Sequence, residues 1–234
     1  MNVAPTARLV GGIDERLDAG AASLGLEMSI EQRERLLAFL ALLMQWNRIY
    51  NLVATRDAGE ILTLHVLDCL AAVAPLRRVL ASRPEPRLAD VGSGGGLPGA
   101  VFAIMNRELD VTCIDSVGKK AAFVRHVASA LQLNNLSAEH GRVEQLRSPG
   151  FDIVTSRAFA SLVDFVRLTQ SLRAEEGVWM AMKGKRPDAE IEALPESVQV
   201  FHVEHLIVPN LSAARCIVWI QGQTYHSRKV SEHS

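Results

Sequence analysis

The chain has 234 residues, of which 48% are hydrophobic and 22% charged, and this composition excludes an intrinsically disordered or collagen-like protein. At this length we expect one principal hydrophobic core. Because 25 Lys and Arg residues are balanced by 26 Asp and Glu residues, the net charge is -1, which excludes a broadly basic surface of the kind that binds nucleic acid unspecifically.

The three cysteines, Cys69, Cys113 and Cys216, are far apart in the sequence. Their spacing predicts neither a disulfide framework nor a zinc site, so we expect no metal and a reducing compartment. Residues 1–20 lack the apolar segment of a secretory signal, and the longest strongly apolar run, 36–46, is half a membrane span. These features predict a cytoplasmic protein that does not associate with a membrane.

The first third of the chain has a helical pattern. Apolar residues recur every three or four positions over about 30–49, with Ser29 as the expected N-cap, and Asp57 opens a second helical region that reaches about residue 79. A polar, proline-containing connector at 81–86 follows. We therefore expect a helical extension over 1–83, an α/β domain over 84–222 and a flexible tail over 223–234.

After the connector, short apolar runs alternate with amphipathic stretches, which is typical of a mostly parallel sheet covered on both faces. The expected strands are 88–91, 111–114, 136–139, 152–155, 178–182, 198–208 and 216–220. The expected helices between the first five strands are 98–105, 119–131, 143–146 and 162–172. Little sequence separates the last two strands, so we expect them to form a closing antiparallel hairpin.

Residues 90–99 read DVGSGGGLPG and lie between the first expected strand and a helix. Glycines such as Gly92 and Gly94 allow a sharp turn, and a ligand can then lie against the backbone N–H groups. Asp115 ends the second expected strand, where an acid commonly binds a ribose, at roughly the 20-residue spacing typical of nucleoside sites. The loop and Asp115 together predict a nucleoside-binding site.

Two kinds of nucleoside cofactor are compatible with this loop. Gly94, Gly96 and Gly99 have the spacing of a dinucleotide fingerprint, which would indicate an NAD-dependent oxidoreductase. However, Pro98 lies inside that fingerprint, and Asp90 precedes the first glycine, where a carboxylate would repel phosphate and attract a cation. The ammonium and sulfonium groups of S-adenosylmethionine suit such an acid better.

Further blocks distinguish among methyltransferases. They are Trp46-Asn47-Arg48-Ile49-Tyr50-Asn51-Leu52, His65-Val66-Leu67-Asp68, Asp115-Ser116-Val117-Gly118-Lys119-Lys120, Arg142-Val143-Glu144, Ser156-Arg157-Ala158-Phe159-Ala160 and Met182-Lys183-Gly184. With the glycine loop, these blocks resemble the bacterial ribosomal RNA small subunit methyltransferase G family, also called the glucose-inhibited division protein B family, over about residues 36–195.

The resemblance implies a Rossmann-like class I S-adenosylmethionine-dependent methyltransferase, with seven strands and the last one antiparallel. It implies methylation of guanine N7 at position 527, in the standard numbering, of 16S ribosomal RNA, free or in the small ribosomal subunit. It also implies that Gly92 and Leu97 line the cofactor, Asp115 binds the ribose, Val143 and Glu144 flank the adenine, and Arg157 lies near the methionine end. We expect a monomer.

Guanine N7 carries a lone pair and no proton, so its methylation requires no general base, and no catalytic side chain is assigned. His65 and Asp68 lie on one helical face, either as a proton relay or as a structural pair joining the helices to the sheet. The candidate RNA-binding cations are Lys119, Lys120, Arg125, Lys183, Lys185 and Arg186, with Arg48 and Arg56 as additions. Phe159 is expected either to stack on a base or to join the core.

Other functions remain open from the residues alone. A methyltransferase for a small molecule or a protein, an NAD-dependent oxidoreductase and a non-catalytic S-adenosylmethionine-binding module are the alternatives.

Overall fold

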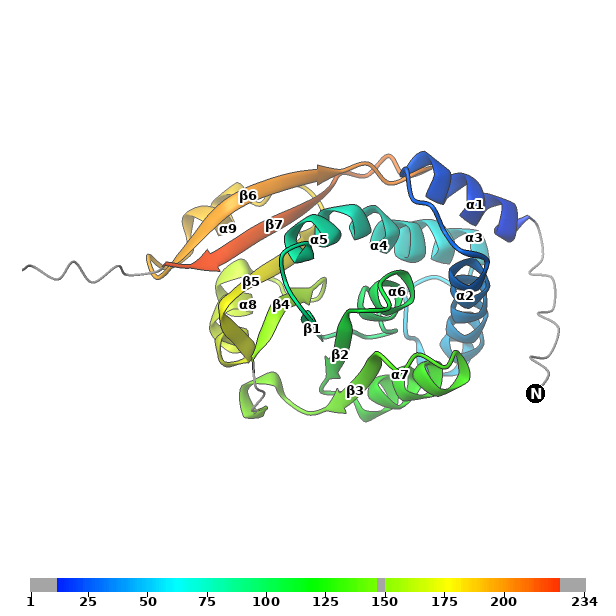
Figure 1. Ribbon diagram of the computed structural model, residues 1–234, viewed down its shortest axis with the longest axis horizontal. Helices are drawn as coiled ribbons and strands as arrows, with labels where there is room; N and C mark the ends of the chain where they lie inside the picture. Colours follow the sequence, from blue (N-terminus) through cyan, green and yellow to red (C-terminus); the bar gives the residue numbers. More distant parts are fainter. Residues whose placement is uncertain (1–11, 147–149, 224–234) are drawn as a thin grey trace, which may run out of the picture.

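The computed structural model describes residues 12–146 and 150–223, so the expected tail lies outside the described residues from 224 onward. A seven-stranded sheet forms the centre, in the order β3-β2-β1-β4-β5-β7-β6 (Figure 1). The strands are β1 Arg87–Val91, β2 Asp110–Asp115, β3 Leu136–His140, β4 Phe151–Ser156, β5 Arg173–Lys183, β6 Val198–Leu206 and β7 Arg215–Gly222. Strands β1 to β5 are parallel, and β7 runs antiparallel to both of its neighbours. The expected fold is confirmed.

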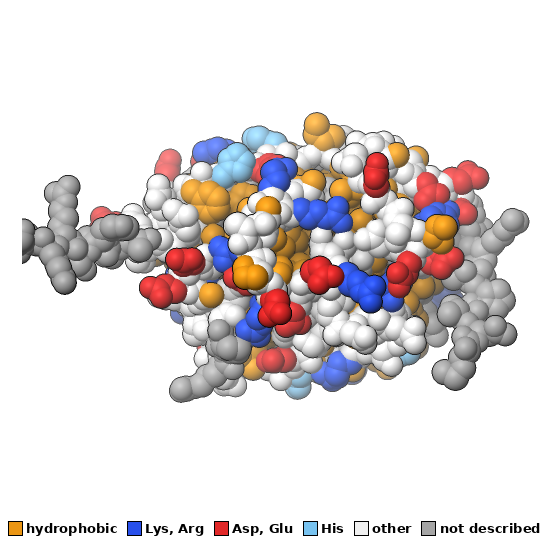
Figure 2. Space-filling view, viewed as in Figure 1, with side chains coloured by type: hydrophobic (Ala, Val, Ile, Leu, Met, Phe, Trp, Pro, Cys, Tyr) orange, Lys and Arg blue, Asp and Glu red, His pale blue; other side chains and the backbone are white. Residues whose placement is uncertain are grey.

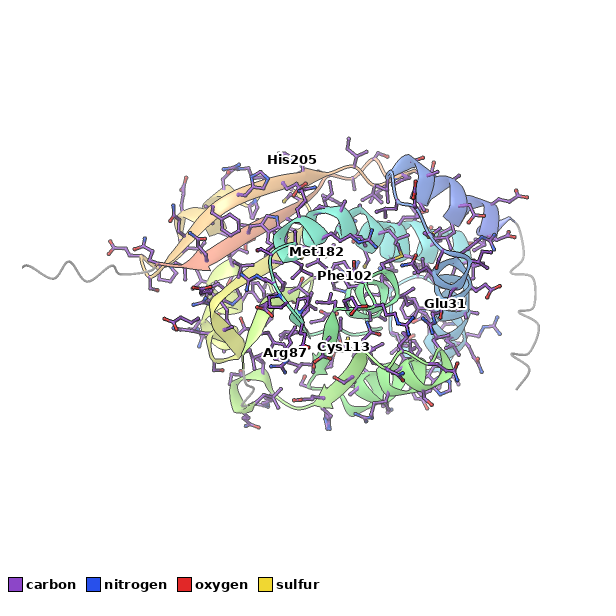
Figure 3. All side chains as sticks on the ribbon, in the orientation of Figure 1. Glu31, Arg87, Phe102, Cys113, Met182 and His205 are labelled. Atoms are coloured by element: carbon purple, nitrogen blue, oxygen red, sulfur yellow. The ribbon has the colours of Figure 1, made fainter. Side chains whose placement is uncertain are left out.

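Helices cover both faces of the sheet because successive side chains of each strand point to opposite sides. In β1, Leu88 joins a core formed with the N-terminal helices, α6 (Gly99–Met105) and α7 (Gly118–Ala130), whereas Ala89 joins a second core with α8 (Leu162–Thr169). Phe102 of α6 and Cys113 of β2 lie inside the first core (Figure 3). Short 3-10 turns, Val143–Gln145 and Gln170–Leu172, and helix α9, Asp188–Glu192, complete this part of the chain.

The N-terminal helices are α1 Ile13–Ser23 and α2 Ile30–Tyr50, followed by a nearly continuous helical run over Ala58–Leu80. That run consists of α3 Ala58–Ile61, a π-helical segment Leu62–Leu67, α4 Asp68–Ala71 and α5 Val73–Leu80. Ser29 caps α2 in a capping box with Gln32, and Asp57 caps α3 by accepting from Glu60 N–H, as expected. The apolar faces of these N-terminal helices belong to the same hydrophobic core as one face of the sheet.

The helical run Ala58–Leu80 is long and apolar enough to cross a membrane, but 72% of its apolar window is buried inside the fold. The core helix of a globular domain meets the same criterion of length and composition. Its apolar character is explained here by packing against α1, α2 and α6 in the core.

Two helices were not expected from the sequence. Helix α1 has Gly12 at its N-cap position, where no side chain can cap it, and its buried side consists of Ile13, Leu17, Gly20 and Ala21. Because Gly20 and Ala21 have little or no side chain, they weaken the apolar pattern of this helix. Helix α9 buries no residue, so it has no apolar periodicity to detect.

Candidate functional site

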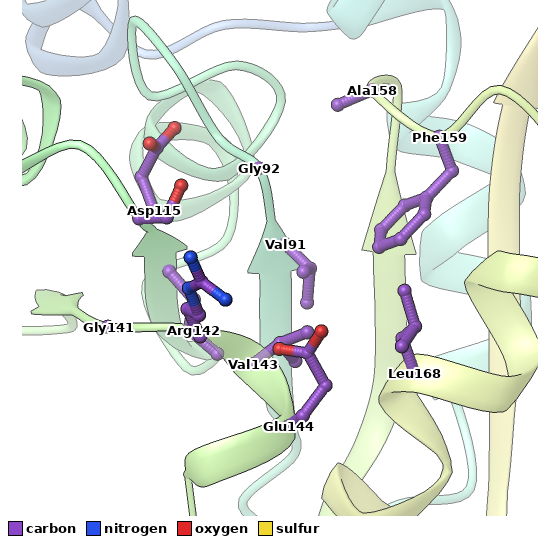
Figure 4. A pocket seen from close by; sticks show the side chains of 12 residues that line it. Val91, Gly92, Asp115, Gly141, Arg142, Val143, Glu144, Ala158, Phe159 and Leu168 are labelled. Carbon is purple, nitrogen blue, oxygen red and sulfur yellow. The ribbon is translucent and has the colours of Figure 1, made fainter.

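A cavity of about 390 Å³ opens at the carboxyl ends of β1, β2 and β4 (Figure 4). We call it the first cavity. Asp115 and Arg142 lie on one side of it, and Phe159 and Leu168 lie across from them. Its lining residues are Val91, Gly92, Ile114, Asp115, Ser116, Gly141, Arg142, Val143, Glu144, Ala158, Phe159 and Leu168.

Asp115 is fixed by backbone donors. Its Oδ2 accepts from the N–H of Gly94 at 3.0 Å, and its Oδ1 accepts from the N–H of Val117 at 2.8 Å. Lys120 Nζ lies 3.9 Å from Oδ2. Each carboxylate oxygen keeps a further lone pair, so the residue can hold the glycine loop and still accept from a ligand hydroxyl in the cavity.

The glycine loop approaches the segment after β4 closely. Gly92 has φ +72°, and a Cβ there would lie 2.9 Å from the Cβ of Ala158. Only glycine combines this left-handed conformation with so close an approach. The backbone of Gly92 therefore forms the floor of the first cavity, where a ligand can contact it without an intervening side chain.

Asp90 is fully buried beneath this loop, and its Oδ2 accepts from Gly99 N–H at 2.8 Å. Burial raises the pKa of this carboxyl to about 7, although the Gly99 hydrogen bond and the charge of Arg157 act in the opposite direction. Within the described residues, neither Asp90 Oδ1 nor the buried Ser93 Oγ has a hydrogen-bond partner. A buried acceptor without a partner is costly, and a cationic group such as an ammonium would satisfy it.

The residues expected to bind a cofactor are separated by the structure. Gly92, Asp115, Val143 and Glu144 line the first cavity, and Gly94 holds Asp115 beside it. Leu97 is buried in the core shared with the N-terminal helices. Phe159 packs on Phe165 at 5.2 Å between ring centroids and forms a wall of the cavity.

Arg157 lies in a second cavity of about 270 Å³, which adjoins the first through the loop 157–159. The second cavity is lined by Leu64, His65, Asp68, Arg157, Met182, Lys183, Gly184, Leu206, Arg215 and Cys216. These residues come from the helical run 58–80, the end of β4, the end of β5 and the hairpin of β6 and β7. The cavity is mixed in character, with apolar walls from Leu64, Met182 and Leu206.

Asp68 joins three parts of the fold in this second cavity. Its Oδ2 accepts from Arg157 Nη1 at 2.8 Å, and its Oδ1 accepts from Arg215 Nε at 2.9 Å. Arg157 Nη2 lies 3.4 Å from Nδ1 of His65. His65 and Asp68 thus meet at Arg157 and form the structural link between helices and sheet, the second of the two interpretations above.

His65 is neutral near pH 7. Burial lowers the pKa of its imidazole to about 4, and the charges of Arg157 and Arg215 lower it further in the same direction. Arg215 was not among the residues selected from the sequence, since it stands at the start of an apolar strand. Only its pairing with Asp68, 147 positions away, reveals it.

Several cations expected to bind RNA are paired with acids. Lys183 Nζ lies 2.8 Å from Glu190 and donates to Phe159 O, and Arg186 pairs with Asp188. Lys119, Arg125 and Lys185 are exposed. On the face seen in Figure 2, acidic and basic side chains are interspersed. On that face, positive charge is therefore not gathered into one large patch.

Within residues 12–146 and 150–223, no three His, Cys, Asp or Glu side chains gather into a group that could hold a metal ion. The three cysteines are free and buried.

The strand order, the glycine loop after β1 and the acid after β2 define a class I methyltransferase fold. Solved structures agree in fold: an S-adenosylmethionine-dependent methyltransferase from Aquifex aeolicus has a TM-score of 0.51 at 13% identity, with 69% of this chain and 92% of that one covered. Another, from Thiobacillus denitrificans, has a TM-score of 0.50 at 12% identity, with 78% and 97% covered.

The family described as rRNA small subunit methyltransferase G matches residues 32–218. Two proteins named ribosomal RNA small subunit methyltransferase G are close relatives. The one from Acidovorax sp. is 55% identical over 215 residues, covering 89% of this chain and 95% of its own. The one from Verminephrobacter eiseniae is 56% identical, covering 88% and 93%. The chain belongs to this methyltransferase family, and the oxidoreductase alternative is thereby set aside.

Proposed function

We propose that this protein transfers the methyl group of S-adenosylmethionine to N7 of a guanine in 16S ribosomal RNA, at position 527 in the standard numbering. The observation that carries the proposal is the loop 157–159, which contributes Ala158 and Phe159 to the first cavity and Arg157 to the second. The shared loop supports the proposal that the methyl donor and the acceptor bind in neighbouring cavities. Membership of the rRNA methyltransferase family supports ribosomal RNA as the substrate class.

The residues of the first cavity fit this cofactor. Asp115 accepts from the ribose hydroxyls, Val143 and Glu144 flank the adenine, and the backbone of Gly92 and Gly94 lies against the remainder. The unpartnered oxygens of Asp90 and Ser93 suit a nearby positive charge. When bound, S-adenosylmethionine supplies an activated methyl group on a sulfonium.

The second cavity fits an acceptor that loses no proton at the reacting atom. The His65 imidazole, with its pKa lowered to about 4, is a weak base. Both oxygens of Asp68 already accept from arginines. Guanine N7 needs only to be held in line with the methyl group, and such positioning can supply several kcal/mol, on the order of 7 or more in favourable cases.

Recognition of the RNA rests on few charges. We propose that Lys119, Arg125 and Lys185 contact phosphates, whereas Lys120, Lys183 and Arg186 act mainly through their partners Asp115, Glu190 and Asp188. The salt dependence of binding scales with the number of phosphates neutralised. With so few available cations, a shallow salt dependence is expected, and the enzyme acts as a cytoplasmic monomer on a preformed RNA shape.

The proposal is tested with small ribosomal subunits and protein-free 16S rRNA from a strain that lacks this gene. The purified protein is incubated with each RNA and S-adenosylmethionine, and N7-methylguanine is mapped by chemical cleavage of the chain at the modified base. A single new cleavage at the expected guanine, on either form of the RNA, is the predicted result. Methylation only of small molecules or of ribosomal proteins would overturn it.

A further inference from the structure

Beside the first cavity, the C-terminus of α2 and the start of α7 expose apolar side chains. Ile49 is 71% exposed, Tyr50 39% and Val117 43%. With Arg48 and Lys119 they form a surface that we call the Tyr50 platform. Six large hydrophobic side chains are exposed in the described part of the chain, and three of them lie on this surface.

The Tyr50 ring is supported from below. Trp46 lies 5.3 Å from it, and Trp46 in turn lies 5.3 Å from the fully buried ring of Phe123. A ring supported by such a row of aromatic side chains loses little freedom when a second flat group is placed on it. Tyr50 therefore has the properties of a stacking surface.

The charge around this ring is positive. Lys119 Nζ lies over the Tyr50 ring, 5.5 Å from its centroid, so a base that stacks on this face takes the place of the long lysine side chain. Arg48, two residues before Tyr50, and Lys119 are both exposed, and within the described residues neither of them forms an ion pair. This contrasts with Lys183 and Arg186, which are neutralised by acids. An exposed aromatic ring flanked by unpaired cations is complementary to a nucleotide, since the base stacks and the phosphate is attracted.

The platform adjoins the cofactor residues. Leu52, two residues after Tyr50, lies 3.7 Å from the position of a Cβ on Gly95 in the glycine loop. Val117 donates its N–H to Asp115. A nucleotide bound on Tyr50 would consequently be near the methyl-transfer site without entering either cavity.

We infer that the Tyr50 platform binds an unpaired nucleotide of the ribosomal RNA other than the one that is methylated. Its base stacks on Tyr50 and packs against Ile49 and Val117, while Lys119 and Arg48 contact the adjoining phosphates. This inference rests on the proposed RNA substrate and adds a contact outside the two cavities.

The test compares variants in binding and turnover on small ribosomal subunits. Tyr50→Ala is expected to raise KM for the subunit about 5- to 150-fold, the range of one lost base stack, with kcat and S-adenosylhomocysteine affinity within about threefold of wild type. Tyr50→Phe, which keeps the ring, is expected to behave as wild type. Phe201→Ala, which removes an exposed aromatic ring on β6 (42% exposed), serves as the matched control and is expected to have no effect.

Two further measurements identify the occupant. Lys119→Gln is expected to lower the slope of log affinity against log salt by about one. Tyr50→p-benzoylphenylalanine, irradiated in the complex, is expected to crosslink to 16S rRNA. A crosslink only to a ribosomal protein, a KM unchanged by Tyr50→Ala, or a loss shared by Tyr50→Phe would overturn the inference. A wild-type enzyme that methylates no RNA would instead overturn the proposed function on which it rests.

Discussion

Gly94 donates its backbone N–H to Oδ2 of Asp115 at 3.0 Å, so the loop after β1 is fastened to the acid after β2. Strands β1 and β2 pair in parallel from Arg87 and Asp110 to Val91 and Ile114, and the Gly94–Asp115 bond adds a contact beyond the last of these pairs. This contact thus links the shape of the glycine loop to the position of Asp115, which we propose binds the ribose.

Asp115→Ala is predicted to lower S-adenosylhomocysteine affinity by about 100-fold or more. It removes the acceptor for the ribose and also the acceptor for two backbone N–H groups, those of Gly94 and Val117; such losses cost about 1–3 kcal/mol each. Titration calorimetry measures the affinity. Asp110→Ala, at the exposed start of the same strand, is the control and should bind as wild type; equal losses in both variants would contradict a specific role.

Asp68→Asn is predicted to remove most methylation while leaving cofactor affinity within a few fold. The change weakens the pairing of two arginines with a buried carboxylate, and breaking a buried pair typically costs about 3–5 kcal/mol of stability. Asp152→Asn breaks the Arg83–Asp152 pair, whose atoms lie 2.7 Å apart near the amino end of β4, away from the second cavity. This control should lose stability but retain activity per folded molecule, as measured by urea unfolding and turnover together. If both variants lose activity in proportion to stability, the second cavity has no role in methyl transfer.

Asp90→Asn is predicted to change how stability depends on pH. The folded state raises the pKa of Asp90 from 3.8 to about 7, so the folded protein binds more protons than the unfolded chain between these values. The contribution of Asp90 to stability is therefore full below about pH 4 and is lost as the pH rises to about 7. Asn does not ionise, and the variant should gain stability relative to wild type over that window, by on the order of a few kcal/mol.

Urea unfolding at several pH values checks this difference. His65, with its pKa lowered to about 4, contributes in the opposite sense, because its stabilisation is lost as the pH falls. That slope is common to both proteins and cancels in the comparison. A difference between Asp90→Asn and wild type that stays constant from about pH 4 to about pH 7 would show that Asp90 is ionised throughout.

Gly99→Ala is predicted to destabilise the protein by about 1–3 kcal/mol, the usual cost of overpacking. A Cβ at this position would lie 2.5 Å from Cys113 Sγ and 3.0 Å from Asp90 Oδ2. Cys113→Ala in the same chain should restore part of the loss. Gly184→Ala, whose Cβ would have its nearest neighbour at 3.8 Å, is the control, and thermal or urea unfolding provides the measurement.

Much of the fold was predictable because local signals agreed with one another. The caps at Ser29 and Asp57, the apolar strands and the loop at 90–99 each have short-range patterns that the structure confirms. Strand β5 begins at Arg173, five residues before the expected 178, because its first residues are polar or exposed and do not alternate. The π-helical segment Leu62–Leu67 carries the same apolar pattern as an α-helix and could not be distinguished from one.

The candidate site was predictable where it depends on one loop and one acid. Gly92 and Asp115 were located from their spacing, and both line the first cavity. The second cavity depends on contacts between distant segments. Arg157 and Arg215 both contact Asp68, from 89 and 147 positions away in the sequence. Local sequence patterns cannot predict contacts between residues so far apart.

The same arrangement has a consequence for synthesis of the protein. The first cavity is lined by residues up to Leu168, whereas the second requires Arg215 on the last strand. Domains generally fold as units. Arg215 reaches Asp68 only in the complete sheet, where the final strand β7 lies between β5 and β6. A chain that is still being synthesised therefore lacks a wall of the second cavity until its last strand has been made.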